Sequence, residues 1–217
     1  DDDILLGGVQ SILLVEDSIR FYSTYLPELY RLILLQNTEF LKDAYNEGQL
    51  IQRKRSRPKI LLATNFEDAQ ALYNRYRDNL LGVISDVGFV LHRDDPPALE
   101  KSDAGIDLCR MIRQDNPLMP VLLQSSQTDF RPIAEELGAG FIAKNSKTLL
   151  SQMSDYLARE FAFGDFLFRD LATGQVIGRA KDLRQMQELL ASIPDDVLEF
   201  NTGPVSYTHL RAHETLA

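Results

Sequence analysis

Five short runs of Ile, Leu and Val recur along the chain, each followed by a segment with helical spacing. The runs are SILLVED (11–17), PKILLATN (58–65), LLGVISDV (80–87), PVLLQSS (120–126) and GFIAKNS (140–146). Continuous apolar runs of this length are typical of strands that are buried on both faces. Strands that alternate with helices predict an α/β domain, in which a doubly wound parallel sheet carries helices on both faces.

The segments between these runs repeat apolar residues at intervals of three and four, as one face of a helix does. The stripes are Ile19, Tyr22, Leu26, Leu29 and Ile33; Ala69, Leu72 and Tyr76; Ile106, Cys109 and Ile112; Ile133, Ala134 and Leu137; and Leu149, Leu150, Met153, Tyr156 and Leu157. The first connection is longer than a crossover needs. We therefore expect an extended helix, or a helical hairpin, that ends near Gln52. Residues 89–105 are polar, contain two prolines and predict a long loop.

Composition limits the classes of function that the chain can have. It has 217 residues and a net charge of −9, which argues against a nucleic-acid surface. The basic run RKRSRPK (53–59) is interpreted as a solvated linker. No run approaches the roughly 20 apolar residues of a membrane span. The single cysteine, Cys109, excludes an intrachain disulfide, is expected in the core and fits a reducing, cytoplasmic compartment.

Changes in pattern predict four parts of the chain. Residues 1–10 form an acidic leader that begins without Met, so we expect a piece of a longer protein. Residues 11–163 form the α/β domain, and residues 164–204 form a linker or the start of a further domain, with a hairpin-like TGQ turn and an amphipathic stretch at 180–193. Residues 205–217 resemble translated vector sequence and are expected to be a non-native tail.

Chemically reactive side chains stand where the predicted strands end. Glu16 and Asp17 follow the first strand, Asp86 ends the third, Ser125 and Ser126 end the fourth, and Lys144 follows the fifth. In a doubly wound sheet the carboxyl ends of the strands share one edge, where ligands bind. We therefore expect three carboxylates, a hydroxyl and an ammonium group to lie together.

This set of residues suits phosphoryl transfer. Close carboxylates repel each other and attract a cation, and oxygen ligands suit Mg²⁺, to which a backbone carbonyl near Gly88 could add a ligand. Asp86 could then attack a phosphoryl group, while the metal and Lys144 neutralise charge on the transferred oxygens. Ser125, favoured over Ser126 by its spacing from Pro120, would hydrogen-bond the product.

The motifs VEDS (15–18), ISDV (84–87), PVLLQSS (120–126) and GAGFIAK (138–144) together resemble the response-regulator receiver domain of two-component signalling, over about residues 11–160. The resemblance implies a flavodoxin-like, five-stranded sheet in the order 2-1-3-4-5. It implies a Mg²⁺ site at Glu16, Asp17, Asp86 and Gly88, and phosphorylation on Asp86 with Lys144 and Ser125 assisting. Ser125 and Phe141 would be the switch residues.

The same resemblance implies partners. The phosphodonor would be a histidine kinase or a phosphotransfer protein. The signal would pass to an output domain of the same or another chain, and the domain could also form a homodimer. The domain itself is not expected to be a conventional enzyme beyond self-dephosphorylation, although its parent protein could be one. The segment from Phe168 to Asp196 resembles a stretch of phosphoenolpyruvate synthase-like proteins, which would make this a regulatory part of such a parent.

Two departures from the receiver pattern leave alternatives open. Asn145 replaces the usual proline after the lysine, so we expect either a cis Lys144–Asn145 bond or a rearranged trans loop. The long 89–105 loop replaces the usual residues after the phosphoacceptor and could cover Asp86 or bind a partner. The domain could therefore be a degenerate receiver that acts only as an interaction module. A phosphatase of the haloacid dehalogenase type also uses a nucleophilic Asp, but it needs a second acid two residues later, on the first strand. Here Gly88 holds that position, and Asp86 is on the third predicted strand.

Overall fold

Five parallel strands form one sheet in the order β2-β1-β3-β4-β5, which confirms the predicted doubly wound, flavodoxin-like fold. The computed structural model describes residues 2–41, 57–161, 166–170, 173, 175–180 and 188–194. The strands of the sheet are β1 (Ser11–Val15), β2 (Lys59–Ala63), β3 (Leu80–Asp86), β4 (Val121–Ser125) and β5 (Gly140–Ala143). Each coincides with one of the five apolar runs; the side chains of β1, β3 and β4 are almost all buried between the helices, whereas those of the edge strands β2 and β5 are mostly half-buried.

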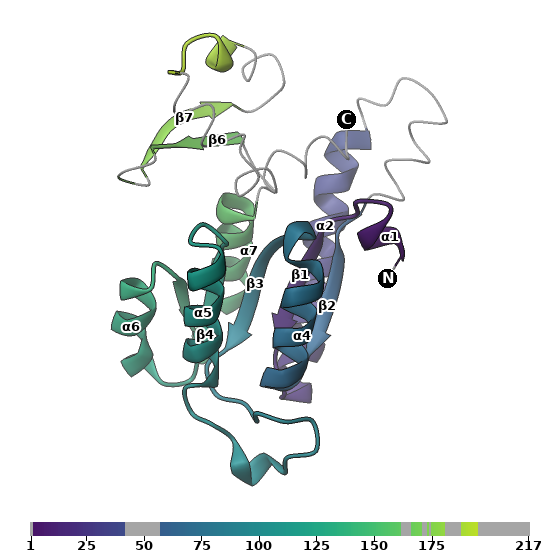
Figure 1. Cartoon of the computed structure of the whole chain (residues 1–217), viewed down its shortest axis with the longest axis vertical. Coiled ribbons are helices and arrows are strands. Elements are labelled where there is room, and N and C mark those ends of the chain that lie inside the picture. The colour runs from purple at the N-terminus through teal and green to yellow at the C-terminus, as the bar shows by residue number, and fades with distance from the viewer. Residues whose placement is uncertain are drawn as a thin grey trace.

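Helices cover the two faces of the sheet (Figure 1). The helices of the domain are α2 (Ile19–Leu41), α4 (Phe66–Tyr76), α5 (Ala104–Asp115), α6 (Arg131–Glu136) and α7 (Leu149–Glu160). Side chains of α2 and α7 pack in one apolar cluster, and side chains of α4, α5 and α6 pack in another. Short 3-10 turns occur at Arg77–Asn79, Pro97–Leu99 and Thr128–Phe130.

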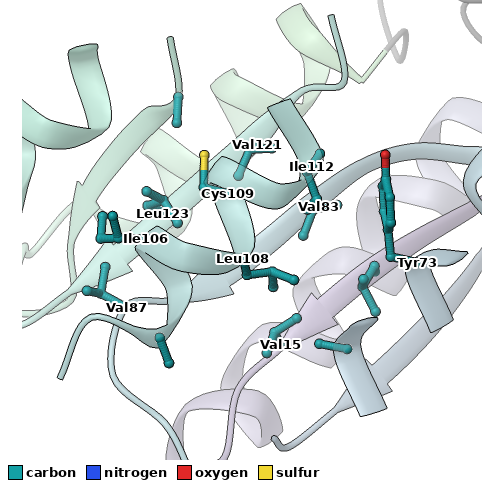
Figure 2. Close-up of a cluster of buried hydrophobic side chains, with 14 of the residues drawn as sticks. Val15, Tyr73, Val83, Val87, Ile106, Leu108, Cys109, Ile112, Val121 and Leu123 are labelled. Atoms are coloured by element: carbon teal, nitrogen blue, oxygen red, sulfur yellow. The ribbon is translucent and has the colours of Figure 1, made fainter. Parts of the chain in front are cut away.

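The cluster under α4 and α5 forms the larger part of the core (Figure 2). Ile106, Leu108, Cys109 and Ile112 of α5 are all at most 1% exposed and face Val83 and the other apolar side chains of the central strands. Cys109 is therefore a core residue, as predicted. Burial of each such side chain contributes roughly 1.5–3 kcal/mol relative to exposure.

The predicted stripe on α2 is partly wrong. Leu29 and Ile33 are buried and Tyr22 and Leu26 pack against the same cluster, as predicted, but Ile19 is 71% exposed and the third fully buried residue is Tyr25. At about 100° per residue, the six positions from Ile19 to Tyr25 turn the side chain of Ile19 about 120° away from the packed face. The predicted end of this connection near Gln52 lies outside the described residues.

The segments flanking the domain are described only in part. The leader contains a short helix, α1 (Asp2–Leu5), which the sequence pattern did not predict. The predicted hairpin is confirmed by the antiparallel pair β6 (Phe166–Arg169) and β7 (Val176–Ala180). The tail at 205–217, most of the basic run at 53–59 and much of the stretch at 180–193 lie outside the described residues. None of the described helices has the length and apolar character to cross a membrane.

Candidate functional site

Three carboxylates meet at the edge of the sheet where β1 and β3 end. β1 pairs with β3 in parallel, with Val15 opposite Ser85, so Glu16 and Asp17 emerge beside Asp86. One carboxylate oxygen from each of the three acids lies within 4.8 Å of the others. This spacing and an all-oxygen donor set fit a hard divalent cation such as Mg²⁺.

Lys144 extends into this group of acids from the end of β5. Its Nζ lies 2.7 Å from Glu16 Oε2 and also forms an ion pair with Asp86 Oδ2. The backbone N–H of Lys144 donates to Ser125 O at 2.8 Å, which fixes the start of the loop. The Lys144–Asn145 peptide bond is trans, as are the other peptide bonds of the described residues. Of the two expected alternatives, the trans loop is therefore found, and the lysine reaches the acids without a following proline.

The first turn of α2 covers the ammonium group. The Nζ of Lys144 lies 4.3 Å from the centroid of the Phe21 ring, within the range of a cation–π interaction. The Lys144 side chain is only 4% exposed. Phe21 therefore shields the lysine from water and restricts its position, a role that the sequence pattern did not predict.

Asp86 is held by neighbouring backbone. Its Oδ1 accepts a hydrogen bond from the Val87 N–H at 2.7 Å, and its side chain remains 13% exposed. Val87 O accepts from the Gly105 N–H at 2.8 Å. A β-carbon on Gly105 would collide with Asp86 O, so the start of α5 can approach the strand end only with glycine there. The carboxylate is thus fixed in direction yet accessible.

Burial and mutual repulsion change the protonation of the acids. The pKa of Glu16 is raised to about 7, mainly by burial and then by the charge of Asp86, although Lys144 opposes both. The pKa of Asp17 is also raised, by burial, then Asp86, then Glu100. One lysine therefore does not neutralise the group, and a divalent cation would relieve the remaining repulsion.

The side chains of the other expected site residues, Ser125 and Phe141, have no described contact with the three acids or with the ammonium group of Lys144. Ser125 ends β4 beside β3 and is 7% exposed, and its Oγ accepts from the Gln127 N–H at 3.0 Å. Phe141 lies on β5, half-buried, with the Arg131 guanidinium 4.9 Å from its ring centroid. Gly88 lies two residues beyond Asp86, with the Glu100 carboxylate beside it.

The solved structures similar to this chain include receiver domains. One is a response regulator receiver domain from Clostridium thermocellum, with 16% identity, a TM-score of 0.45, and coverage of 70% of this chain and 94% of that one. Another is the receiver domain of the sensor histidine kinase PA1611 from Pseudomonas aeruginosa, with 18% identity, a TM-score of 0.45, and coverage of 70% and 98%. That structure has a magnesium ion coordinated in its active-site cleft.

A third similar structure is the chemotaxis protein CheY4 of Vibrio cholerae, with 17% identity, a TM-score of 0.42, and coverage of 70% of this chain and 98% of that one. No family model and no curated sequence matches the chain, so the expected link to phosphoenolpyruvate synthase-like proteins finds no support. The assignment of the fold rests on the strand order of this chain itself.

Proposed function

We propose that this chain is a phosphoryl-accepting receiver that takes up a phosphoryl group on Asp86 in the presence of Mg²⁺. The observation that supports this best is the convergence of Glu16, Asp17 and Asp86 within 4.8 Å, with Lys144 paired to two of them. A partly exposed carboxylate beside a cation site and a buried ammonium is the arrangement that aspartyl phosphorylation requires.

Each residue of the proposed site has a definable part in the reaction. An Asp86 carboxylate oxygen bonds to phosphorus while the donor's bond to phosphorus breaks, and the donor keeps that electron pair. Glu16, Asp17, Asp86 and the Gly88 carbonyl would hold Mg²⁺, which supplies positive charge to the phosphoryl oxygens. Lys144 neutralises the same charge from the side of β5. Ser125 would hydrogen-bond the phosphoryl group, and Phe141 would move with it as the switch aromatic.

The proposal extends to domain boundaries and partners. We place the receiver at residues 11–163, with a leader before it, residues 164–204 as a linker or start of a further domain, and residues 205–217 as a non-native tail. The donor would be a histidine kinase or phosphotransfer protein, and the signal would pass to an output domain in the cytoplasm.

A degenerate receiver that binds partners without phosphorylation is the second candidate function. Asn145 in place of the usual proline and the long 89–105 loop favour this second candidate.

Intact-mass spectrometry after incubation with MgCl₂ and acetyl phosphate tests the proposal. We expect one added phosphoryl group on the wild type and none on Asp86→Asn or when EDTA replaces MgCl₂. Asp129→Asn, which neutralises an exposed acid in the neighbouring Thr128–Phe130 turn, is the matched control and should be modified like the wild type. Labelling of Asp86→Asn at the wild-type level would refute the assignment. Absence of any adduct, together with no binding of beryllofluoride, would favour the degenerate receiver.

A further inference from the structure

The long connection between β3 and α5 folds back on itself close to the acidic site. Its two ends are joined by an antiparallel bridge, in which Phe89 N donates to Lys101 O at 3.2 Å and Lys101 N donates to Phe89 O at 3.1 Å. The connection extends from the sheet edge at which β3 ends (Figure 1). In this register Ser102 lies opposite Gly88 and Glu100 lies opposite Val90, and the carboxylate of Glu100 reaches back past the bridge to Gly88, two residues after Asp86.

This loop is fixed to the body of the domain. Phe89 is 0% exposed, and the first backbone N–H groups of α4 donate to it, from Phe66 to Val90 O at 3.1 Å and from Glu67 to Leu91 O at 3.0 Å. The Glu100 N–H donates to Pro97 O at 3.1 Å, at the end of the short 3-10 turn. The backbone position of Glu100 is therefore set by hydrogen bonds on both of its sides.

The carboxylate of Glu100 occupies the space that a side chain at position 88 would fill. A β-carbon added at Gly88 would collide with Glu100 Oε1. The charge of Glu100 also acts on Asp17, since it contributes to the raised pKa of that acid. Glu100 thus belongs electrostatically to the group formed by Glu16, Asp17 and Asp86, although it comes from the inserted loop.

We propose that Glu100 strengthens cation binding at the Mg²⁺ site by placing a fourth carboxylate beside Gly88. The proposal rests on the proposed function, because it assumes a cation at the acid group. Mg²⁺ keeps several of its waters when bound to protein, so a carboxylate near the site can act through a water as well as directly. Coulomb's law at an exposed position such as that of Glu100 gives a gain in affinity of about 3- to 20-fold, which falls as salt increases.

The geometry further predicts that Gly88 and Glu100 act together. Alanine at position 88 keeps the backbone carbonyl but displaces the end of the flexible Glu100 side chain. Gly88→Ala should therefore weaken Mg²⁺ binding in the same way as Glu100→Gln. In Glu100→Gln the negative charge beside the cation site is already gone, so displacement of the glutamine side chain by the added methyl group should not weaken binding further. The double variant should therefore resemble Glu100→Gln alone.

Calorimetric titration of the chain with MgCl₂, without phosphodonor, tests the proposal. We expect Kd to rise about fivefold in Glu100→Gln, in Gly88→Ala and in the double variant at low salt, and these differences to shrink at high salt. Asp94→Asn is the matched control, because it removes the same charge from an exposed position of the same loop; its Kd should stay within about twofold of wild type.

Two outcomes would overturn the proposal, and they are distinguishable. If the wild type binds Mg²⁺ and is phosphorylated on Asp86, but Glu100→Gln binds Mg²⁺ as tightly as wild type or no more weakly than Asp94→Asn, only the role of Glu100 is refuted. If the wild type itself binds no Mg²⁺ and accepts no phosphoryl group, the proposed function fails and the role of Glu100 fails with it.

Discussion

Lys144 Nζ lies 2.7 Å from Glu16 Oε2, and the two side chains are only 4% and 1% exposed. The same ammonium group pairs with Asp86. A buried ion pair of this kind adds little net stability, because the desolvation of both charges offsets their attraction. Removal of one partner is costly, however, because the other charge is left buried and unpaired.

Lys144→Met is therefore expected to lower the free energy of unfolding by about 3 kcal/mol in EDTA, since Glu16 and Asp86 would face each other without the ammonium. Saturating MgCl₂ should restore part of this loss, because the cation would take over the neutralising charge. Urea unfolding followed by circular dichroism measures both values. Lys147→Met, at an exposed lysine of the same loop, is the control and should change stability by less than about 0.5 kcal/mol. Equal losses in the two variants would contradict the ion-pair geometry.

The raised pKa of Glu16 makes metal-free stability depend on pH. Its value of about 7 lies above the 4.5 of the unfolded chain, so the folded state holds the proton more tightly. This contribution to stability is fully present below pH 4.5 and is lost as pH rises through 7, at a cost on the order of 3 kcal/mol. Glu16→Gln should remove that part of the pH dependence. Urea unfolding in EDTA between pH 5 and pH 8 checks it, and an unchanged dependence of stability on pH in the variant would show that Glu16 does not cause it.

The sequence predicted the parts of the site that depend on the sheet. Glu16, Asp17, Asp86 and Lys144 directly follow or end apolar strands, and parallel strands bring such ends to one edge. The pattern did not place Phe21 over Lys144, because the stripe of apolar residues was assigned to a helix face that begins at Ile19.

Glu100 illustrates a different limit. It lies in a polar loop without periodicity, so nothing in the local sequence indicates that the loop turns back toward Gly88. The turn is made by the Phe89–Lys101 bridge and by backbone hydrogen bonds to α4, which pair residues that are distant in the sequence. Such pairings depend on the folded domain. By contrast, the alternation of strands and helices predicted the parallel sheet, and the strand order implied by the receiver resemblance is the one observed.

Gly105→Ala is expected to disturb Asp86 without touching its carboxylate. The added methyl group would overlap Asp86 O, and the start of α5 would have to move away from the end of β3. Overpacking of this kind costs about 2 kcal/mol. We therefore expect lower stability in urea and a slower uptake of the phosphoryl group from acetyl phosphate at saturating MgCl₂. Wild-type values for both would show that the contact between α5 and β3 does not position Asp86.

Phe21→Leu tests whether the aromatic ring holds Lys144 in place. Leucine keeps an apolar side chain on α2 but removes the π face, so we expect a loss of about 1 kcal/mol in the free energy of unfolding. The loss should depend on the lysine, whose Nζ lies 4.3 Å from the ring centroid. In a double-mutant cycle, Phe21→Leu should therefore cost less in a Lys144→Met background than in the wild type, by about 1 kcal/mol. Equal costs in the two backgrounds would show that Phe21 contributes only packing, and the position of Lys144 would then depend on Glu16 and Asp86 alone.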